Sequence, residues 1–242
     1  MNSFFLALQF LTRFPIPYET NFNESEAGKS LFWFPFISAF MGFLVGCAQN
    51  ITFPIAPQIS GFVALMVLYL LNGGLHLDGL ADTADGFLSY RDRDETLRIM
   101  HDSTIGTYGV VALVFLLLGE YGVFSSVMIS PVNLAILLAS SRIGVLFSIY
   151  FFPTATSSTL GNFFKQKSKP LSYIFQWVML FGAILIIRKP QMILFPIVAL
   201  LFSYFFSRVS MKKIGGVSGD VYGAIMELST LLLLLIYGGW MA

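Results

Sequence analysis

Residues 132–152 read VNLAILLASSRIGVLFSIYFF, an apolar run with a single charged side chain, Arg142. About 20 such residues are enough for a helix to cross the hydrocarbon core of a bilayer. The composition of the whole chain agrees, since 56% of its 242 residues are hydrophobic and only 11% are charged. A soluble domain has roughly 25% charged residues. The sequence therefore predicts an integral membrane protein.

Further apolar blocks flank this run on both sides. The blocks are Ser30–Asn50, Gln58–Leu75, Ile105–Ile129, Val132–Phe152, Leu171–Ile187, Gln191–Ser207 and Val221–Trp240. We therefore expect an all-α, polytopic membrane bundle with about seven transmembrane helices, or six to eight given uncertain block edges. Residues 1–242 are expected to form a single integral membrane domain. The N-terminal MNSFFLALQFLTRFPIP has no basic n-region, and we expect a retained amphipathic or re-entrant segment there.

Basic residues between the blocks fall almost entirely on one side of the membrane if the blocks alternate in direction. One side receives Arg13, Lys29, Arg91, Arg93, Arg98, Lys165, Lys167, Lys169, Arg208, Lys212 and Lys213. The other side receives only Arg188 and Lys189. Because cytoplasmic loops carry an excess of Lys and Arg, the pattern predicts a multi-pass protein of the cell (cytoplasmic) membrane with a cytoplasmic N-terminus.

An acidic segment, residues 76–86 with the sequence HLDGLADTADG, follows the second block on the predicted cytoplasmic side. In a helix, Asp78, Asp82 and Asp85 share one face. Like charges at this spacing destabilise a bare helix, and a bound divalent cation would remove the repulsion. Mg²⁺ suits such a site because it prefers carboxylate, water and phosphate oxygens. His76 is either a catalytic residue or a histidine at the membrane edge.

Two further motifs lie on the same side of the membrane. Residues 100–109, MHDSTIGTYG, place Asp102 where a helix is expected to start, as an N-cap or a catalytic acid. Residues 214–227, IGGVSGDVYGAIME, combine a glycine-rich turn with Asp220 at the mouth of the last helix. Backbone amides in such a turn, around Gly216 and Gly219, can bind phosphate groups. We therefore expect the active site at the cytoplasmic face.

Three charged residues lie deeper, inside the apolar blocks. They are Glu120, Arg142 and Glu227. Ionisable groups inside a membrane usually face a cavity or a partner. Arg142 is therefore expected either to pair with Glu120 or to reach a phosphate of the substrate. The single cysteine, Cys47, excludes an internal disulfide and a zinc site built from several cysteines.

Four motifs together resemble the cobalamin synthase (adenosylcobinamide-GDP ribazoletransferase) family. In chain order they are FLTRFPIP, GGLHLDGLADTADG, IMHDSTIGTYG and GGVSGDVYGAIMEL. The resemblance implies an enzyme that joins adenosylcobinamide-GDP to α-ribazole or its 5′-phosphate and releases GMP, using Mg²⁺. It also implies a lipid bilayer environment and no nucleic-acid partner. The oligomeric state stays open.

The reaction suggests roles for the residues singled out above. The candidate metal ligands are Asp78, Asp82 and Asp85, with Asp220 as a further candidate from the last helix. His76 and Asp102 are the candidates for the base that accepts the proton of the attacking hydroxyl. Arg91, Arg98, Lys212 and Lys213 are either phosphate contacts or charges that only set the topology, and Arg142 and the turn around Gly216 and Gly219 are further candidates for phosphate binding.

Three other functions fit parts of the pattern. A CDP-alcohol phosphotransferase shares the opening DTADG at residues 82–86, but the Ala-Arg expected next is replaced by Ser89-Tyr90. An aromatic prenyltransferase would need a second acidic motif, and this chain has only one later Asp in that region. An ion-coupled transporter would use Glu120, Arg142 and Glu227 near the midplane, whereas most acids here lie at the membrane edge.

Overall fold

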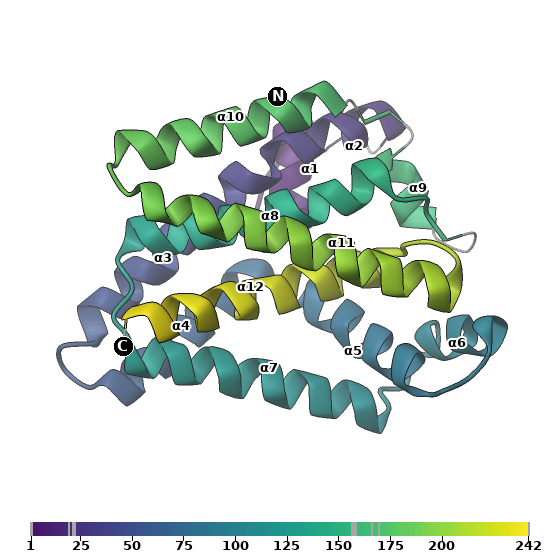
Figure 1. The fold of residues 1–242 in the computed structure, drawn as a ribbon, viewed down its shortest axis with the longest axis horizontal. Helices are drawn as coiled ribbons and strands as arrows, with labels where there is room; N and C mark the ends of the chain where they lie inside the picture. Colours follow the sequence, from purple (N-terminus) through teal and green to yellow (C-terminus); the bar gives the residue numbers. More distant parts are fainter. Residues whose placement is uncertain are drawn as a thin grey trace.

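A computed structural model describes residues 2–18, 20, 23–155, 159–165, 167–168 and 170–241. Within these ranges the regular secondary structure is helical, apart from one isolated β-bridge between Thr154 and Val217. The first helices are α1 (Asn2–Leu11), α2 (Glu24–Ser30), η1 (Leu31–Trp33), α3 (Phe34–Thr52), α4 (Pro57–Asn72), α5 (Leu75–Leu88) and α6 (Arg93–Met100). They are followed by α7 (Thr107–Ser126), α8 (Pro131–Phe151), α9 (Thr159–Lys165), α10 (Pro170–Ile186), η2 (Pro190–Ile193), α11 (Leu194–Ile214) and α12 (Gly219–Met241). Figure 1 shows them as one bundle.

Five helical segments of the described residues are long and apolar enough to cross a membrane. They are Glu24–Thr52, Thr107–Ser126, Pro131–Phe151, Pro190–Ile214 and Gly219–Trp240. A sixth span is possible if α4 and α5, which meet at 94°, count as one broken span. The all-helical membrane fold is confirmed, but the count of seven is not. The reason is length, since the 16 residues of α4 and the 17 of α10 extend only about 24–26 Å at about 1.5 Å per residue.

The central helix of the bundle is α8, the most buried of the five segments. Small residues allow its neighbours to approach closely. A Cβ added at Gly42 or Gly46 of α3 would lie 2.6 Å from Leu134 O or 2.5 Å from Pro131 Cα. On another side of α8, a Cβ at Gly144 would lie 2.7 Å from Ala199 O of α11. Such close approach is the usual way in which helices associate in lipid.

The break between α4 and α5 is caused by two consecutive glycines. Gly73 and Gly74 have φ values of 71° and 73°, in the left-handed region that side chains disfavour. The amide of Gly74 donates to Asn72 Oδ1 at 2.8 Å, which stabilises the turn. The second predicted block therefore ends at Asn72 instead of Leu75. The break lets α5 leave the direction of α4 and carry its acids towards α12.

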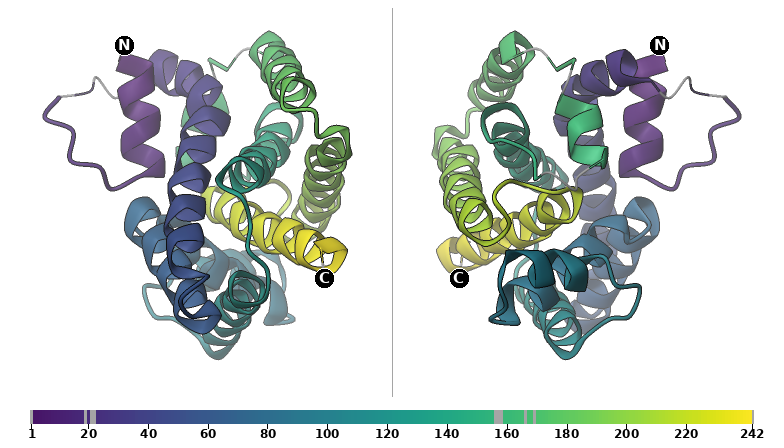
Figure 2. Two further views of the ribbon diagram at one scale, coloured as in Figure 1. Left: turned by 90° about the vertical axis from the view of Figure 1, so that its left-hand side faces the viewer. Right: turned by 90° about the vertical axis from the view of Figure 1, so that its right-hand side faces the viewer.

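The long helices alternate in direction, so that the connections gather at two ends of the bundle (Figure 1). One end holds the loop from α5 through α6 to α7, together with α9 and the turn from α11 to α12 (Figures 1 and 2). The link from α10 to α11, with Arg188 and Lys189, lies at the opposite end. The segments that carry Arg91, Lys212 and Lys213 therefore lie at the end opposite to Arg188 and Lys189, while Lys169 lies outside the described residues.

Candidate active site

The acidic segment is a helix, as its spacing predicts, but its three acids have different environments. Along α5, Asp78 is exposed, Asp82 is half-buried and Asp85 is buried. The helix packs against α12 and α7. A Cβ at Gly79 would lie 2.8 Å from Asp220 O, so the two backbones touch there. This contact brings Asp220 next to the acids of α5.

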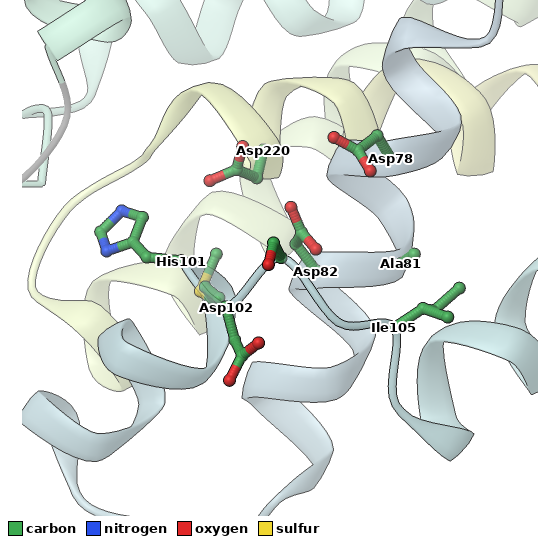
Figure 3. A pocket seen from close by; sticks show the side chains of 9 residues that line it. Asp78, Ala81, Asp82, His101, Asp102, Ile105 and Asp220 are labelled. Carbon is green, nitrogen blue, oxygen red and sulfur yellow. The ribbon is translucent and has the colours of Figure 1, made fainter.

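A pocket of about 430 Å³ opens where these helices meet the loop before α7. It is lined by Asp78, Ala81, Asp82, Met100, His101, Asp102, Ser103, Ile105 and Asp220. Figure 3 shows the carboxylates of Asp78, Asp82 and Asp220 around a common space, whereas that of Asp102 points away from them. This arrangement agrees with the prediction that separate motifs come together at one site.

Asp102 does not begin a helix. Its Oδ1 accepts hydrogen bonds from the amide and the hydroxyl of Thr104, at 2.9 and 2.6 Å. These bonds favour the charged form and hold the pKa of Asp102 below its usual range. The helix α7 starts later, at Thr107, with Gly106 as its N-cap residue. The expected N-cap role of Asp102 is therefore wrong, and the residue instead forms part of the pocket wall.

The donor set of the pocket fits a hard divalent cation. Three carboxylates of like charge face one another without a basic side chain among the lining residues, apart from His101. Within the described residues, no three His, Cys, Asp or Glu side chains are arranged as a ready-made metal cluster. Mg²⁺ usually takes only one or two carboxylates and completes its shell with water and substrate phosphate. The open pocket suits this mode of binding.

Asp85 is directed elsewhere. Its Oδ2 accepts from the amide of Gly106 at 2.7 Å, and its Oδ1 accepts from the amide of Gly109 at 2.9 Å. It is only 8% exposed and does not line the pocket. The three acids of this helix face thus have two different surroundings. Asp78 and Asp82 face the pocket, and Asp85 faces the start of α7.

His76 and Arg142 are both buried away from the pocket. The Nδ1 atom of His76 lies 3.8 Å from Glu227 Oε1. His76 also borders a separate cavity of about 20 Å³. Arg142 is 3% exposed and donates to Ser141 Oγ at 3.0 Å and to Thr230 Oγ1 at 3.2 Å. The geometry therefore gives neither residue a place at the pocket.

The expected Arg142–Glu120 pair is not formed among the described residues, whose salt bridges lie elsewhere. The hydroxyl of Tyr69 instead links two carboxylates, donating to Glu120 Oε2 at 2.8 Å and lying 3.3 Å from Glu227 Oε2. We call Tyr69, His76, Glu120, Arg142 and Glu227 the buried network. All five come from different helices, and they form a polar centre inside the bundle.

The glycine-rich turn is packed against the chain instead of lining the pocket. A Cβ at Gly216 would lie 2.3 Å from Ala155 N, and the amide of Val217 donates to Pro153 O at 2.9 Å. Gly219 borders the small cavity next to His76. The predicted phosphate contact through Gly216 and Gly219 therefore has no counterpart in the pocket lining.

The four other predicted basic contacts, Arg91, Arg98, Lys212 and Lys213, do not line the pocket either. Arg98 forms a bidentate pair with Glu95 at 2.7 and 2.8 Å. Lys213 lies 5.8 Å from the ring centre of Tyr90, while Arg91 and Lys212 are exposed. These cations occupy the same end of the bundle as the carboxylates (Figure 1).

His101 is a titratable residue of the pocket lining that the sequence did not single out. It is exposed, lies at the end of α6 and lines the edge of the pocket, with its ring turned away from Asp78 and Asp82 (Figure 3). Its position directly before Asp102 was the available signal, because a residue next to a proposed site residue in a loop often lines the same site. The sequence instead favoured His76, which shares a helix with the acids.

Comparison with known proteins matches the chain to one family. The family model described as cobalamin-5-phosphate synthase matches residues 3–238. The adenosylcobinamide-GDP ribazoletransferase of Treponema denticola is 34% identical, over 97% of this chain and 96% of the relative. Proteins of the same name from Clostridium botulinum (strain Okra) and Brevibacillus brevis are 34% and 33% identical, covering 98% and 99% of this chain and 97% and 99% of those relatives. No solved structure matches the chain.

Proposed function

The chain belongs to the cobalamin-5-phosphate synthase family, and from this premise we propose that it is an adenosylcobinamide-GDP ribazoletransferase whose active site is the acidic pocket. It is thus a transferase of a late step in cobalamin biosynthesis. One observation carries the placement of the site: carboxylates from two motifs more than a hundred residues apart converge on one open pocket. The family match favours this function over the phosphotransferase, prenyltransferase and transporter alternatives.

The reaction is a displacement at phosphorus. A hydroxyl oxygen of α-ribazole or its 5′-phosphate forms a bond to the phosphorus attached to the cobinamide, and the bond between that phosphorus and GMP breaks. The attacking hydroxyl loses a proton, and GMP leaves with the electron pair. The protein must therefore hold two anionic substrates in line and accept one proton.

Asp78, Asp82 and Asp220 are proposed to hold Mg²⁺. When bound there, the ion would neutralise negative charge on the diphosphate and on the departing GMP. Asp78 and Asp82 lie one turn apart on α5, and the close contact at Gly79 keeps Asp220 of α12 beside them. The rigid pair of helices thus fixes the positions of the carboxylates before any substrate binds.

His101 replaces His76 as the proposed proton acceptor. His101 lines the pocket, whereas His76 is 4% exposed and faces the buried network. Asp102 is the second possibility, although the hydrogen bonds from Thr104 lower its pKa and make it a weaker base. An imidazole nitrogen can accept the proton of a hydroxyl within hydrogen-bond distance.

The pocket is proposed to face the cytoplasm, in the cell membrane. Arg91, Arg98, Lys212 and Lys213 lie at the same end of the bundle as the pocket. Positive charge at that end agrees with the rule for cytoplasmic loops. The same charges would draw anionic substrates towards the pocket without touching the reacting atoms.

The test is a product assay on the purified protein with MgCl₂, adenosylcobinamide-GDP and α-ribazole, with release of GMP measured. We expect GMP release by the wild type and a fall of at least about a hundredfold in Asp82→Asn, since the stabilisation of transition-state charge is worth several kcal/mol. The control is Asp94→Asn, which removes an exposed acid of the neighbouring helix α6 that does not line the pocket. Normal turnover by folded Asp82→Asn would place the reaction elsewhere.

A further inference from the structure

The carboxylate of Asp85 joins two helices that are separate in the sequence. It extends from the last turns of α5 and accepts hydrogen bonds from the amides of Gly106 and Gly109, at 2.7 and 2.9 Å. These amides belong to the start of α7, where helix amides have no partner within the helix. The N-cap residue Gly106 supplies no side chain to satisfy them. Asp85 therefore caps the start of α7 from another helix, α5. It accepts the hydrogen bonds that the side chain of an N-cap residue normally accepts.

Glycine is required at both amides for this contact to form. A Cβ at Gly106 would lie 2.4 Å from Asp85 Oδ1, and a Cβ at Gly109 would lie 2.5 Å from Asp85 Oδ2. A side chain at either position would have to displace the carboxylate. The spacing of the two glycines in the IGTYG stretch is thus matched to one acid that lies 21 and 24 residues earlier in the chain.

The segment anchored in this way forms one wall of the pocket. His101, Asp102, Ser103 and Ile105 all line it. At its start, the amide of Asp102 donates to Ile99 O at 3.1 Å, which ties the segment to α6. At its end, Gly106 is held by Asp85. With both ends tied, the lining side chains keep their positions relative to Asp82 and Asp220.

We propose that Asp85 is a positioning residue that fixes the wall of the pocket formed by residues 101–106, and that it does not ligate the metal ion. The proposal deepens the proposed function, because it takes this pocket as the active site. It divides the acidic motif into two roles: Asp78 and Asp82 face the reacting groups, whereas Asp85 acts through the backbone of α7.

Hydrogen–deuterium exchange on purified protein in detergent tests the contact without any assay of activity. The Asn side chain of Asp85→Asn keeps the shape of Asp but presents one donor group to two backbone donors, so at least one hydrogen bond is lost. We expect exchange of the amides of residues 106–109 to rise at least about tenfold in Asp85→Asn, because hydrogen bonds to charged groups are among the stronger ones. Exchange there should be unchanged in Asp82→Asn. Unchanged exchange in Asp85→Asn would overturn the proposal.

The dependence of GMP release on the MgCl₂ concentration separates positioning from metal binding. Asp85→Asn should lower kcat while the MgCl₂ concentration for half-maximal activity stays at the wild-type value. Asp82→Asn should raise that concentration. A shift in Asp85→Asn as large as that in Asp82→Asn would make Asp85 a ligand and overturn the proposal.

Gly106→Ala breaks the same contact from the other side and keeps the test valid if Asp85→Asn does not fold. It should reproduce both the faster exchange and the lower kcat, and the double variant should be no worse than the single ones. Gly122→Ala is the matched control on the same helix, since among the described residues no atom beyond its chain neighbours and its own helix backbone lies within 4 Å of its added Cβ. Full activity in Asp82→Asn with faster exchange in Asp85→Asn would refute the proposed function alone and leave the contact established.

Discussion

Replacing Gly79 by alanine would push α5 away from α12 where the two acidic motifs meet. The added Cβ would lie 2.8 Å from Asp220 O and 2.9 Å from Asp220 Cα, both of them backbone atoms. Ordinary contact begins at 3.4 Å, so the helices must separate by 3.4 − 2.8 = 0.6 Å. A backbone cannot yield as the end of a flexible side chain can. The shift therefore moves Asp220 relative to Asp78 and Asp82.

Two effects of opposite sign act on the stability of Gly79→Ala. Overpacking costs about 1–3 kcal/mol, while replacing glycine by alanine in a helix contributes about 1 kcal/mol. The net destabilisation is therefore roughly 0–2 kcal/mol. Catalysis should suffer more, because a displacement of about 1 Å can lower the rate a hundredfold. For 0.6 Å we expect a loss on the order of tenfold in GMP release.

A graded series of alanine substitutions provides the assay. The Cβ of Gly223→Ala would lie 3.1 Å from His76 O, so its effect should be smaller, and Gly122→Ala meets nothing within 4 Å. Thermal unfolding in detergent and GMP release are measured for each variant. The loss of activity should follow the order Gly79, Gly223, Gly122. Equal activity in all three folded variants would refute the argument that helix contact sets the geometry of the acids.

Two further predictions concern the buried residues and the topology. Arg142→Leu should destabilise the protein by roughly 1.5–3 kcal/mol, measured by thermal unfolding, because the charged hydrogen bonds to Ser141 and Thr230 are lost; a stable variant that binds adenosylcobinamide-GDP poorly would return Arg142 to the substrate site. In a Cys47→Ala background, a cysteine at Gln191 should react with an impermeant thiol reagent added to intact cells and a cysteine at Asp94 should not, and labelling of position 94 would reverse the proposed orientation.

The sequence predicted that the acidic segment is helical, but it did not predict that its three acids have different contacts. The spacing of Asp78, Asp82 and Asp85 is a local property, so the shared face could be read directly. Their division depends on Asp220 and Gly106, which reach α5 only through the packing of α12 and α7. Contacts between residues so far apart in the chain leave no periodic pattern in a single sequence.

For a similar reason the sequence predicted that the chain is a membrane protein. It did not predict the number of membrane spans or where each one ends. Composition and block length are sums over many residues, so they tolerate errors at the edges. The end of α4 depends on two residues, Gly73 and Gly74, whose left-handed conformations turn the chain by 94° into α5. The choice between His76 and His101 likewise depended on the direction of α5 after this turn, which no local pattern gives.

The buried network and the pocket differ in the partners that their charged groups have. His76 and Glu227 lie on the same two helices as Asp78 and Asp220, but they face the interior and are each less than 5% exposed. The charged groups of the interior have neighbours supplied by the protein, since Tyr69 contacts both glutamates and Arg142 donates to hydroxyls of α8 and α12. No comparable cation lines the pocket, where the carboxylates have mainly one another. Because like charges in a partly desolvated site repel strongly, a bound cation would stabilise the arrangement, which supports the proposal that the pocket takes Mg²⁺ together with anionic substrates.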